Sequence, residues 1–189
     1  FLSTLLLQLQ FAVLIGILTS LAIYILRTSV PNVIPVLPAK NFRHFTNQPE
    51  SHQCPQIAIF DILGDLYFGA ANHVEEILRQ HLEKNPSQRF LLLRMISVHQ
   101  CDISGIHILE SIVDFMRERG GDVYFMRVQP PVLDLMKTTG FYDYLGPENC
   151  LSYDQAISFI YHHVLDPAIC IYECEQRVFL ECQNLPKRI

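Results

Sequence analysis

An uncharged stretch at the start of the chain limits most strongly what the sequence can fold into. Residues 1–26 contain no charged side chain, and Arg27 is the first charged residue. A helix of that length reaches about 39 Å, which exceeds the roughly 30 Å of a bilayer core. A secretory signal would need a basic start, a shorter apolar stretch and a small-residue cleavage site, and the sequence has none of these. The sequence therefore predicts a transmembrane segment over residues 1–29, with a buried helix of a soluble protein as the alternative.

The charges after this segment predict its orientation. Arg27, Lys40 and Arg43 follow it closely, whereas no Asp or Glu occurs before Glu50. An excess of Lys and Arg next to a membrane segment favours the cytoplasmic side. From Glu50 onward, 11 Lys and Arg stand against 19 Asp and Glu, and this acidic balance argues against a nucleic-acid partner. We therefore expect the rest of the chain in the cytoplasm, where its six cysteines would remain reduced.

The remainder of the chain alternates strand and helix patterns. The patterns predict strands over 32–37, 56–63, 90–96 and 122–128, and helices over 70–84, 104–119, 130–140 and 153–163. We expect the most apolar strand, 90–96, at the centre of the sheet and the proline-containing strand 32–37 at its edge. Such alternation predicts an α/β fold with a mainly parallel sheet and crossover helices.

Three separated segments resemble a known family. Cys101-Asp102-Ile103-Ser104-Gly105-Ile106 lies between a predicted strand and a predicted helix, and it resembles the Asp-x-Ser/Thr-Gly signature of STAS domains. The segment from Gly64 to Asn72, GDLYFGAAN, is similar to one found in the STAS domains attached to sulfate permease (SulP) transporters. Residues 11–20 and 27–31 resemble the last membrane helix of those transporters and its exit. The three segments occur in the order found in the family.

The resemblance implies a STAS-like, mainly parallel or mixed β-sheet preceded by an N-terminal transmembrane helix. It implies the cytosolic region of a multi-pass secondary transporter in the cell membrane, which carries inorganic anions such as sulfate or bicarbonate. The STAS domain would support the assembly or the regulation of transport. Its partners would be the transporter membrane domain, membrane lipid, a second copy in a dimer and a regulatory protein. The implied division is a membrane segment (1–29), a linker with the edge strand (30–55), the STAS domain (56–166) and a cysteine-containing extension (167–189).

The motif residues allow a regulatory and a structural interpretation. Ser104 stands where regulatory STAS proteins are phosphorylated, and a helix N-terminus would favour a phosphate there. We expect it instead to be a helix-capping serine. Asp102 could orient a partner, but we expect it to fix the turn, with Gly105, Gly64 and Asp65 supporting the motif. The alternative function is a membrane-tethered STAS phospho-switch, similar to anti-sigma-factor antagonists, that acts by protein–protein binding.

The C-terminal cysteines and the absence of catalytic motifs complete the prediction. Cys170, Cys174 and Cys182 recur at intervals of four and eight residues, which predicts one face of a short helix packed on the domain. With His162 or His163 they could form a three-Cys-one-His metal site, but the paired spacing typical of zinc sites is only half formed. We therefore expect no metal and no cofactor. The sequence contains no P-loop, dinucleotide-binding glycine motif, catalytic triad or H-E-x-x-H motif, so we expect no enzymatic activity.

Overall fold

The structure, a computed structural model, describes residues 9–28, 31–39, 45–47, 53–152, 156–174, 176–183 and 185. The chain divides into two compact units, Phe1–Val30 and Pro31–Ile189. The first contains helix α2 (Leu9–Thr28), whose large apolar side chains between Phe11 and Ile25 are exposed. Among the described residues, no helix combines the length and the apolarity needed to cross a membrane. The predicted membrane segment begins outside these residues, and it stays a prediction.

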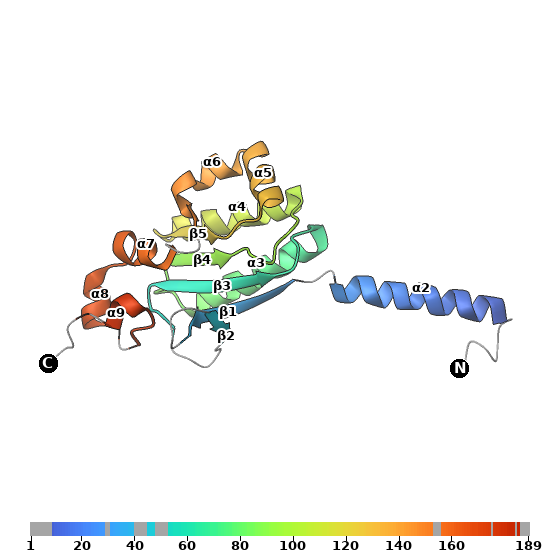
Figure 1. The fold of residues 1–189 in the computed structure, drawn as a ribbon, viewed down its shortest axis with the longest axis horizontal. Coiled ribbons are helices and arrows are strands. Elements are labelled where there is room, and N and C mark those ends of the chain that lie inside the picture. The colour runs from blue at the N-terminus through green and yellow to red at the C-terminus, as the bar shows by residue number, and fades with distance from the viewer. Residues whose placement is uncertain are drawn as a thin grey trace. The chain divides into compact units, whose positions relative to one another are not determined.

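A six-stranded mixed sheet forms the centre of the second unit, with strand order β2-β1-β3-β4-β5-β6 (Figure 1). The strands are β1 (Asn32–Pro38), β2 (Phe45–Asn47), β3 (Ile57–Leu63), β4 (Phe90–Arg94), β5 (Asp122–Met126) and β6 (Cys150–Leu151). Strands β3 to β6 are parallel, whereas β1 is antiparallel to both β2 and β3. This arrangement, with β4 at the centre, confirms the predicted fold class. The predicted edge position of β1 is wrong, because β2 lies outside it and pairs with its residues 36–38. The three residues of β2 are too few to form a recognisable pattern in the sequence.

The helices follow the predicted alternation, with additional short elements. They are α3 (Phe68–Lys84), α4 (Ile103–Glu118), α5 (Pro130–Thr138), α6 (Phe141–Leu145), the 3₁₀-helix η1 (Pro147–Asn149), α7 (Ala156–His163), α8 (Pro167–Tyr172) and α9 (Leu180–Gln183). Of the predicted fourth helix, residues 153–155 lie outside the described residues. Helix α6 and strand β6 were not predicted.

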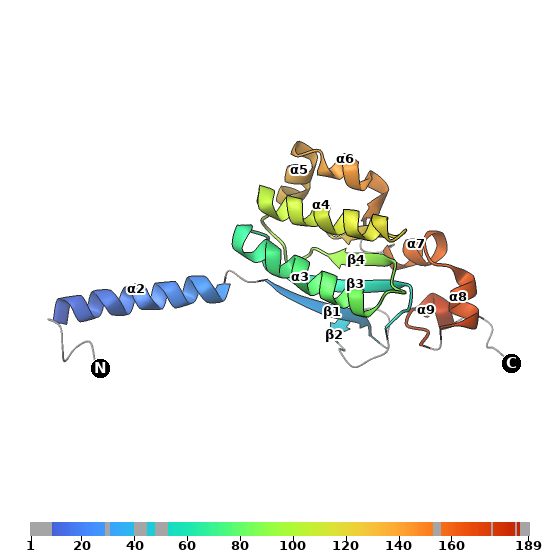
Figure 2. The ribbon, with the colours of Figure 1, turned by 180° about the vertical axis from the view of Figure 1, so that it is seen from behind.

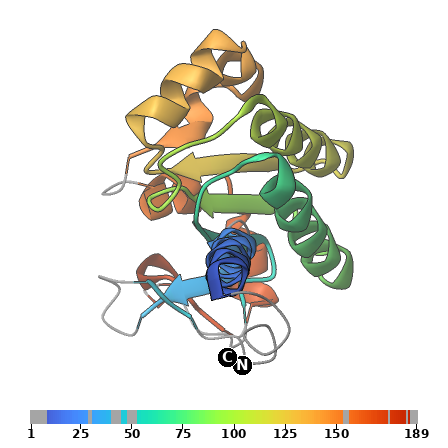
Figure 3. The ribbon, with the colours of Figure 1, turned by 90° about the vertical axis from the view of Figure 1, so that its right-hand side faces the viewer.

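Alternate strand residues point to opposite faces of the sheet and form two apolar cores. On β3, Ala58, Phe60 and Ile62 pack with α3 to α6, whereas Ile57 and Ile59 pack with α7 to α9. Figure 2 shows α3 and α4 in front of the strands, and Figure 3 shows them along one side of the sheet. Because both faces are covered, the parallel strands can be apolar along their whole length.

The C-terminal segment belongs to the second core. Gln56, at the start of β3, accepts a hydrogen bond from the Asp166 N–H (2.8 Å) and donates to the Asp166 carbonyl oxygen (3.0 Å). After this anchor the chain forms two short helices, α8 and α9, so the predicted single cysteine-bearing helix is wrong. The backbone of Arg177 has a φ of 45°, which is incompatible with a continuous right-handed helix across this position. Phe179, directly before α9, is 1% exposed against the sheet.

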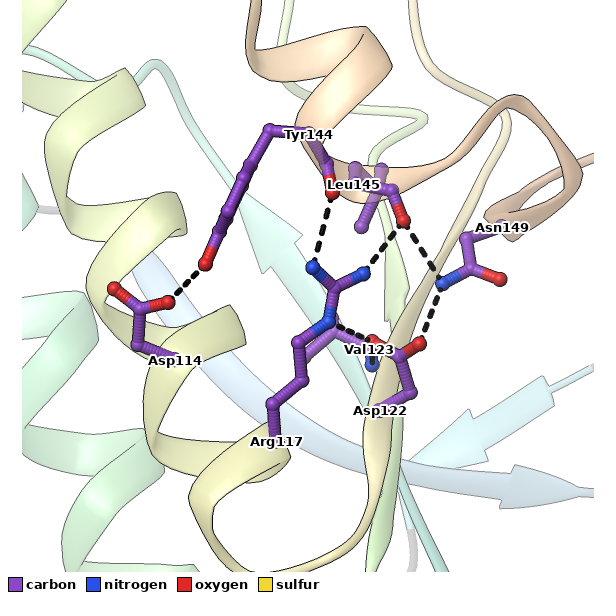
Figure 4. Close-up of polar contacts among 7 residues, drawn as sticks. All are labelled: Asp114, Arg117, Asp122, Val123, Tyr144, Leu145 and Asn149. Carbon is purple, nitrogen blue, oxygen red and sulfur yellow. Dashed lines mark hydrogen bonds and ion pairs between the residues drawn. The ribbon is translucent and has the colours of Figure 1, made fainter.

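A polar network attaches α6 to α4 and β5 (Figure 4). The Arg117 guanidinium on α4 donates to the carbonyl oxygens of Tyr144 (2.9 Å) and Leu145 (2.8 Å) at the end of α6. It also pairs with the carboxylate of Asp122 on β5 at 3.0 Å. The buried Asn149 amide donates to Asp122 (3.0 Å) and to the Leu145 carbonyl oxygen (3.2 Å). One arginine therefore satisfies carbonyl groups that α6 leaves without helical partners.

Candidate functional site

The two predicted motifs meet where β3 and β4 end. Leu66 and Cys101 form a parallel bridge between the loops that follow the two strands. The Leu66 N–H donates to the Gln100 carbonyl oxygen, and the Asp102 N–H donates to the Leu66 carbonyl oxygen, both at 3.0 Å. In a parallel sheet the carboxyl ends of neighbouring strands share one edge, which is where open α/β sheets bind ligands and partners. The fold therefore brings together segments about 35 residues apart in the sequence.

Asp65 holds the second loop in place from the first. Its Oδ1 accepts the backbone N–H groups of His99 (2.9 Å) and Gln100 (2.8 Å). The Tyr67 hydroxyl donates to Oε1 of Gln100, which adds a side-chain contact between the same loops. Asp65 thus holds the backbone of the loop after β4 in place, because its Oδ1 accepts hydrogen bonds from two N–H groups of that loop.

Asp102 connects the starts of two helices. Its Oδ1 accepts the Gly105 N–H at 2.9 Å and so caps α4, while its Oδ2 accepts the Phe68 N–H of α3 at 3.0 Å. A carboxylate at this position satisfies free N–H groups and interacts favourably with both helix dipoles. This geometry corresponds to the turn-fixing role expected for Asp102. The capping role expected for Ser104 is wrong, because Asp102 occupies the cap position.

Ser104 is the second residue of α4 and is partly exposed. The first-turn N–H groups of a helix have no helical acceptors, so this position tolerates added negative charge. The neighbouring Asp102 carboxylate already meets the Gly105 N–H. A phosphate on Ser104 would therefore share the helix end with an existing anion.

Two glycines allow the close approach of the loops. A Cβ atom on Gly105 would lie 2.6 Å from both the Leu66 carbonyl oxygen and the Cys101 Sγ, which is closer than side chains pack. Gly64 has a φ of 130°, a conformation that other residues rarely adopt. A Cβ atom there would lie 3.2 Å from Pro31. Both motif glycines are thus explained by local geometry.

Sequence reasoning missed an exposed apolar patch beside these loops. The amino-end patch, named for the amino ends of α3 and α4 where it lies, consists of Tyr67, Phe68 and Ile103, which are 42%, 75% and 58% exposed. Phe68 and Ile103 both neighbour Asp102, since Phe68 donates its backbone N–H to this carboxylate and Ile103 follows Asp102 in the chain. A signal was present: both residues fall outside the apolar positions that bury the inner faces of α3 and α4. Clustered exposed apolar side chains are typical of contact surfaces.

The site has little nucleophilic character. Burial, followed by the negative charges of Asp102 and Asp65, raises the pKa of the Cys101 thiol to about 12. This cysteine is therefore protonated at neutral pH, whereas the reactive form of a cysteine is the thiolate. The arrangement is suited to holding two loops rigid and presenting a surface to a partner.

The structure also places the candidate metal ligands. Cys170, Cys174 and Cys182 are buried free thiols, whereas His162 and His163 are exposed on α7. The His163 ring stacks on its neighbour Phe159 at 4.8 Å. In the part of the chain that the structure describes, no three or more Cys, His, Asp or Glu side chains are placed to hold a metal ion.

Known transporters and regulators share this architecture. Sulfate transporter 1.1 of Arabidopsis thaliana is 24% identical over 161 residues, which cover 79% of this chain and 25% of that protein. The putative sulfate transporter YvdB of Bacillus subtilis is 26% identical over 104 residues, 55% of this chain and 19% of that protein. The chain thus spans about a fifth to a quarter of the length of these relatives.

Solved structures show the same fold. The structure of the murine Solute Carrier 26 family member A9 anion transporter in the inward-facing state matches with a TM-score of 0.67 and 20% identity, over 85% of this chain and 27% of that one. The anti-sigma factor antagonist SpoIIAA in its unphosphorylated form matches with a TM-score of 0.50 and 14% identity, over 61% of this chain and 96% of that one. These similarities confirm the predicted resemblance to transporter-linked STAS domains. Residues 48–156 match the STAS domain family, and the chain therefore belongs to that family.

Proposed function

We propose that this chain is the cytosolic STAS region of a secondary transporter of inorganic anions of the sulfate or bicarbonate class. The proposal rests on one observation: a chain whose first 26 residues carry no charged side chain is similar in sequence to sulfate transporters. The role of the region is to support the assembly or regulation of transport, and it is non-enzymatic. The rigid loops and protonated Cys101 thiol fit such a role.

The amino-end patch is the proposed contact with the transporter membrane domain. Asn32, the first residue of β1, pairs with Leu63 at the end of β3. The chain therefore enters the domain at the carboxyl ends of the parallel strands, where the amino-end patch lies. The exposed aromatic rings of Tyr67 and Phe68 offer apolar area beside this entry point. A partner at this edge would contact both motif loops.

The proposed location is the cell membrane, in a multi-pass protein. Residues 1–26 would lie against lipid, and Arg27, Lys40 and Arg43 would face the cytoplasm together with the STAS domain. A second copy of the chain completes the proposed transport unit as a homodimer.

A substitution at the loop crossing tests the main proposal. In the full-length transporter, Gly105→Val should abolish sulfate uptake, because its side chain collides with the Leu66 carbonyl oxygen and separates the motif loops. Gly69→Ala is the matched control, since a Cβ atom there meets nothing within 4 Å. Uptake of radiolabelled sulfate and the amount of protein in the membrane are measured together. Loss of membrane protein would indicate an assembly role, and loss of uptake alone a regulatory one. Normal uptake by Gly105→Val would contradict the proposal.

The second candidate is a membrane-tethered phospho-switch acting by protein–protein binding. It is favoured by the position of Ser104 in the first turn of α4 and by the fold shared with SpoIIAA. Ser104→Asp mimics the added charge, and Ser158→Asp adds the same charge to an exposed position on α7. A change in uptake or in partner binding with Ser104→Asp alone would support the switch. Wild-type behaviour of both variants would rule it out.

A further inference from the structure

A cavity opens at the edge of the sheet opposite the motif loops. It lies at the amino ends of β3 and β4, and Figures 1 and 2 show α7 and α8 at this end of the sheet. Its volume of about 400 Å³ falls within the range of roughly 300–1,000 Å³ that is typical of small-molecule sites. Its wall combines the strand starts with the junction between α7 and α8, and includes Gln56, Arg89, Phe90, Val164, Asp166 and Ile169.

Hydrogen bonds and close packing hold this wall in place. The Phe90 N–H donates to the Gln56 carbonyl oxygen at 3.1 Å, which joins the two strand starts. The Gln56 side chain bonds both backbone groups of Asp166, 110 positions later, and so fixes the junction between α7 and α8. A Cβ atom on Gly121 would overlap the Arg89 carbonyl oxygen, so only glycine lets the turn after α4 approach this closely. The cavity is therefore preformed, and a ligand would not have to order it.

The wall carries two opposite charges that are not paired with each other. Arg89 is exposed, and its guanidinium forms no hydrogen bond or ion pair with any residue that the structure describes. Asp166 accepts the Ala168 N–H with Oδ1 at 2.8 Å, and its Oδ2 has no partner in the described part of the chain. A guanidinium binds a carboxylate through two parallel hydrogen bonds, and a carboxylate oxygen accepts from an ammonium group. The free donors and the free acceptor fit a ligand that carries both groups.

Apolar side chains line the same cavity. Phe90, Val164 and Ile169 are partly exposed, so they leave apolar surface in contact with water. An aliphatic group on the ligand would cover this surface. An inorganic anion would meet the Arg89 guanidinium, but it would leave the apolar surface uncovered and would be repelled by the Asp166 carboxylate. The wall therefore favours an aliphatic amino acid over an inorganic anion.

We propose that this cavity is a binding site for an α-amino acid with an aliphatic side chain. The ligand carboxylate accepts hydrogen bonds from the Arg89 guanidinium, and the ligand ammonium group donates to Asp166 Oδ2. The aliphatic side chain packs against Phe90, Val164 and Ile169. The site does not depend on the transporter role proposed above, since it lies at the opposite edge of the sheet from the motif loops and the amino-end patch.

Titration of the isotope-labelled full chain in detergent with L-leucine provides the test. We expect saturable NMR shifts of the backbone N–H signals of Phe90 and Gly120, which line the cavity, and no shift of Gly105 at the opposite edge. L-Leucinamide lacks the carboxylate and N-acetyl-L-leucine lacks the ammonium group, so each should bind at least about tenfold more weakly than L-leucine. The absence of saturable shifts would overturn the proposal. Equal binding of L-leucine and N-acetyl-L-leucine would also overturn it, because the cavity would then bind carboxylates alone.

Two substitutions match each charge to its ligand group. Arg89→Gln should bind L-leucine no more tightly than L-leucinamide, and Asp166→Asn should bind it no more tightly than N-acetyl-L-leucine. Asparagine can still accept the Ala168 N–H, so Asp166→Asn retains the cap of α8. Lys84→Gln and Asp134→Asn are the controls, because they remove the same charges at exposed positions outside the cavity and should keep the wild-type affinity. Circular dichroism checks that all four variants are folded. Wild-type affinity in Arg89→Gln or Asp166→Asn, or an equal loss in the two controls, would contradict the proposal.

Discussion

At the residue scale, one carboxylate explains most of the geometry of the STAS motif. Asp102 receives one N–H from the start of α4 and one from the start of α3, so a single side chain sets the positions of two helices. Ser104, two residues later, receives no such assignment, because the cap is already occupied. The motif thus contains a structural residue, Asp102, and a neighbouring serine whose side chain does not form the cap.

The different roles of these two residues predict different costs of truncation. Asp102→Ala should lower the free energy of unfolding by about 1–3 kcal/mol, because it removes the α4 cap and leaves the Phe68 N–H without its acceptor. Ser104→Ala should change it by no more than about 0.5 kcal/mol. Urea unfolding followed by circular dichroism measures both. A larger loss for Ser104→Ala would restore the serine as the cap.

The sequence located this motif but could not assign its cap. Asp and Ser are both strong capping residues, and a helix starting two residues later, at Gly105, would have made Ser104 the cap. Backbone geometry alone distinguishes the two registers. The contact between Leu66 and Cys101 was also beyond the sequence, because it depends on how the two strands are aligned. Strands β1, β3, β4 and β5, the central position of β4 and the three main helices were predictable, since each has an apolar pattern long enough to recognise.

At the element scale, short elements are stabilised by partners rather than by their own pattern. Helix α6 has five residues and β6 has two, too few for periodicity to reveal either. Both follow α5 in a region where Arg117 and Asn149 bind the end of α6 and Asp122. Side chains from α4 and η1 bind the end of α6, and β6 pairs with β5, so both elements depend on partners that their own sequence does not show.

Removing the guanidinium should loosen α6. We expect Arg117→Gln to reduce the free energy of unfolding by about 1.5–3 kcal/mol, because a charged donor to the carbonyl groups of Tyr144 and Leu145 is lost together with its ion pair. Arg89→Gln, at an exposed arginine, is the control and should change stability by less than about 0.5 kcal/mol. Thermal melting compares the two variants, and hydrogen exchange should show the loss of protection at α6. Equal effects of both substitutions would indicate that the network contributes only surface charge.

At the scale of the whole molecule, the sheet is covered on both faces, and the chain after residue 166 supplies part of the second layer. The cysteine spacing predicted one short helix packed on the domain, but nothing local shows that Phe179 and Cys182 pack against strands more than 50 residues earlier. The interaction of Gln56 with Asp166 closes this layer over the start of β3. Long-range burial of this kind has no periodic signature in the sequence.

If the second layer is part of the cooperative fold, one buried ring should affect the stability of the whole domain. Phe179→Ala removes a side chain that is 1% exposed and should cost about 3–5 kcal/mol, because it leaves a cavity between α9 and the sheet. Tyr172→Ala is the control, since its ring is 66% exposed at the end of α8 and its loss should cost less than about 0.5 kcal/mol. The decisive measurement is hydrogen exchange in β3 and β4 alongside the unfolding midpoint. A cooperative layer predicts that Phe179→Ala accelerates exchange in these strands by the same free energy that it removes from global unfolding. Faster exchange confined to residues after 166, with an unchanged midpoint, would instead mean that the segment detaches on its own and that the first core determines the stability of the fold.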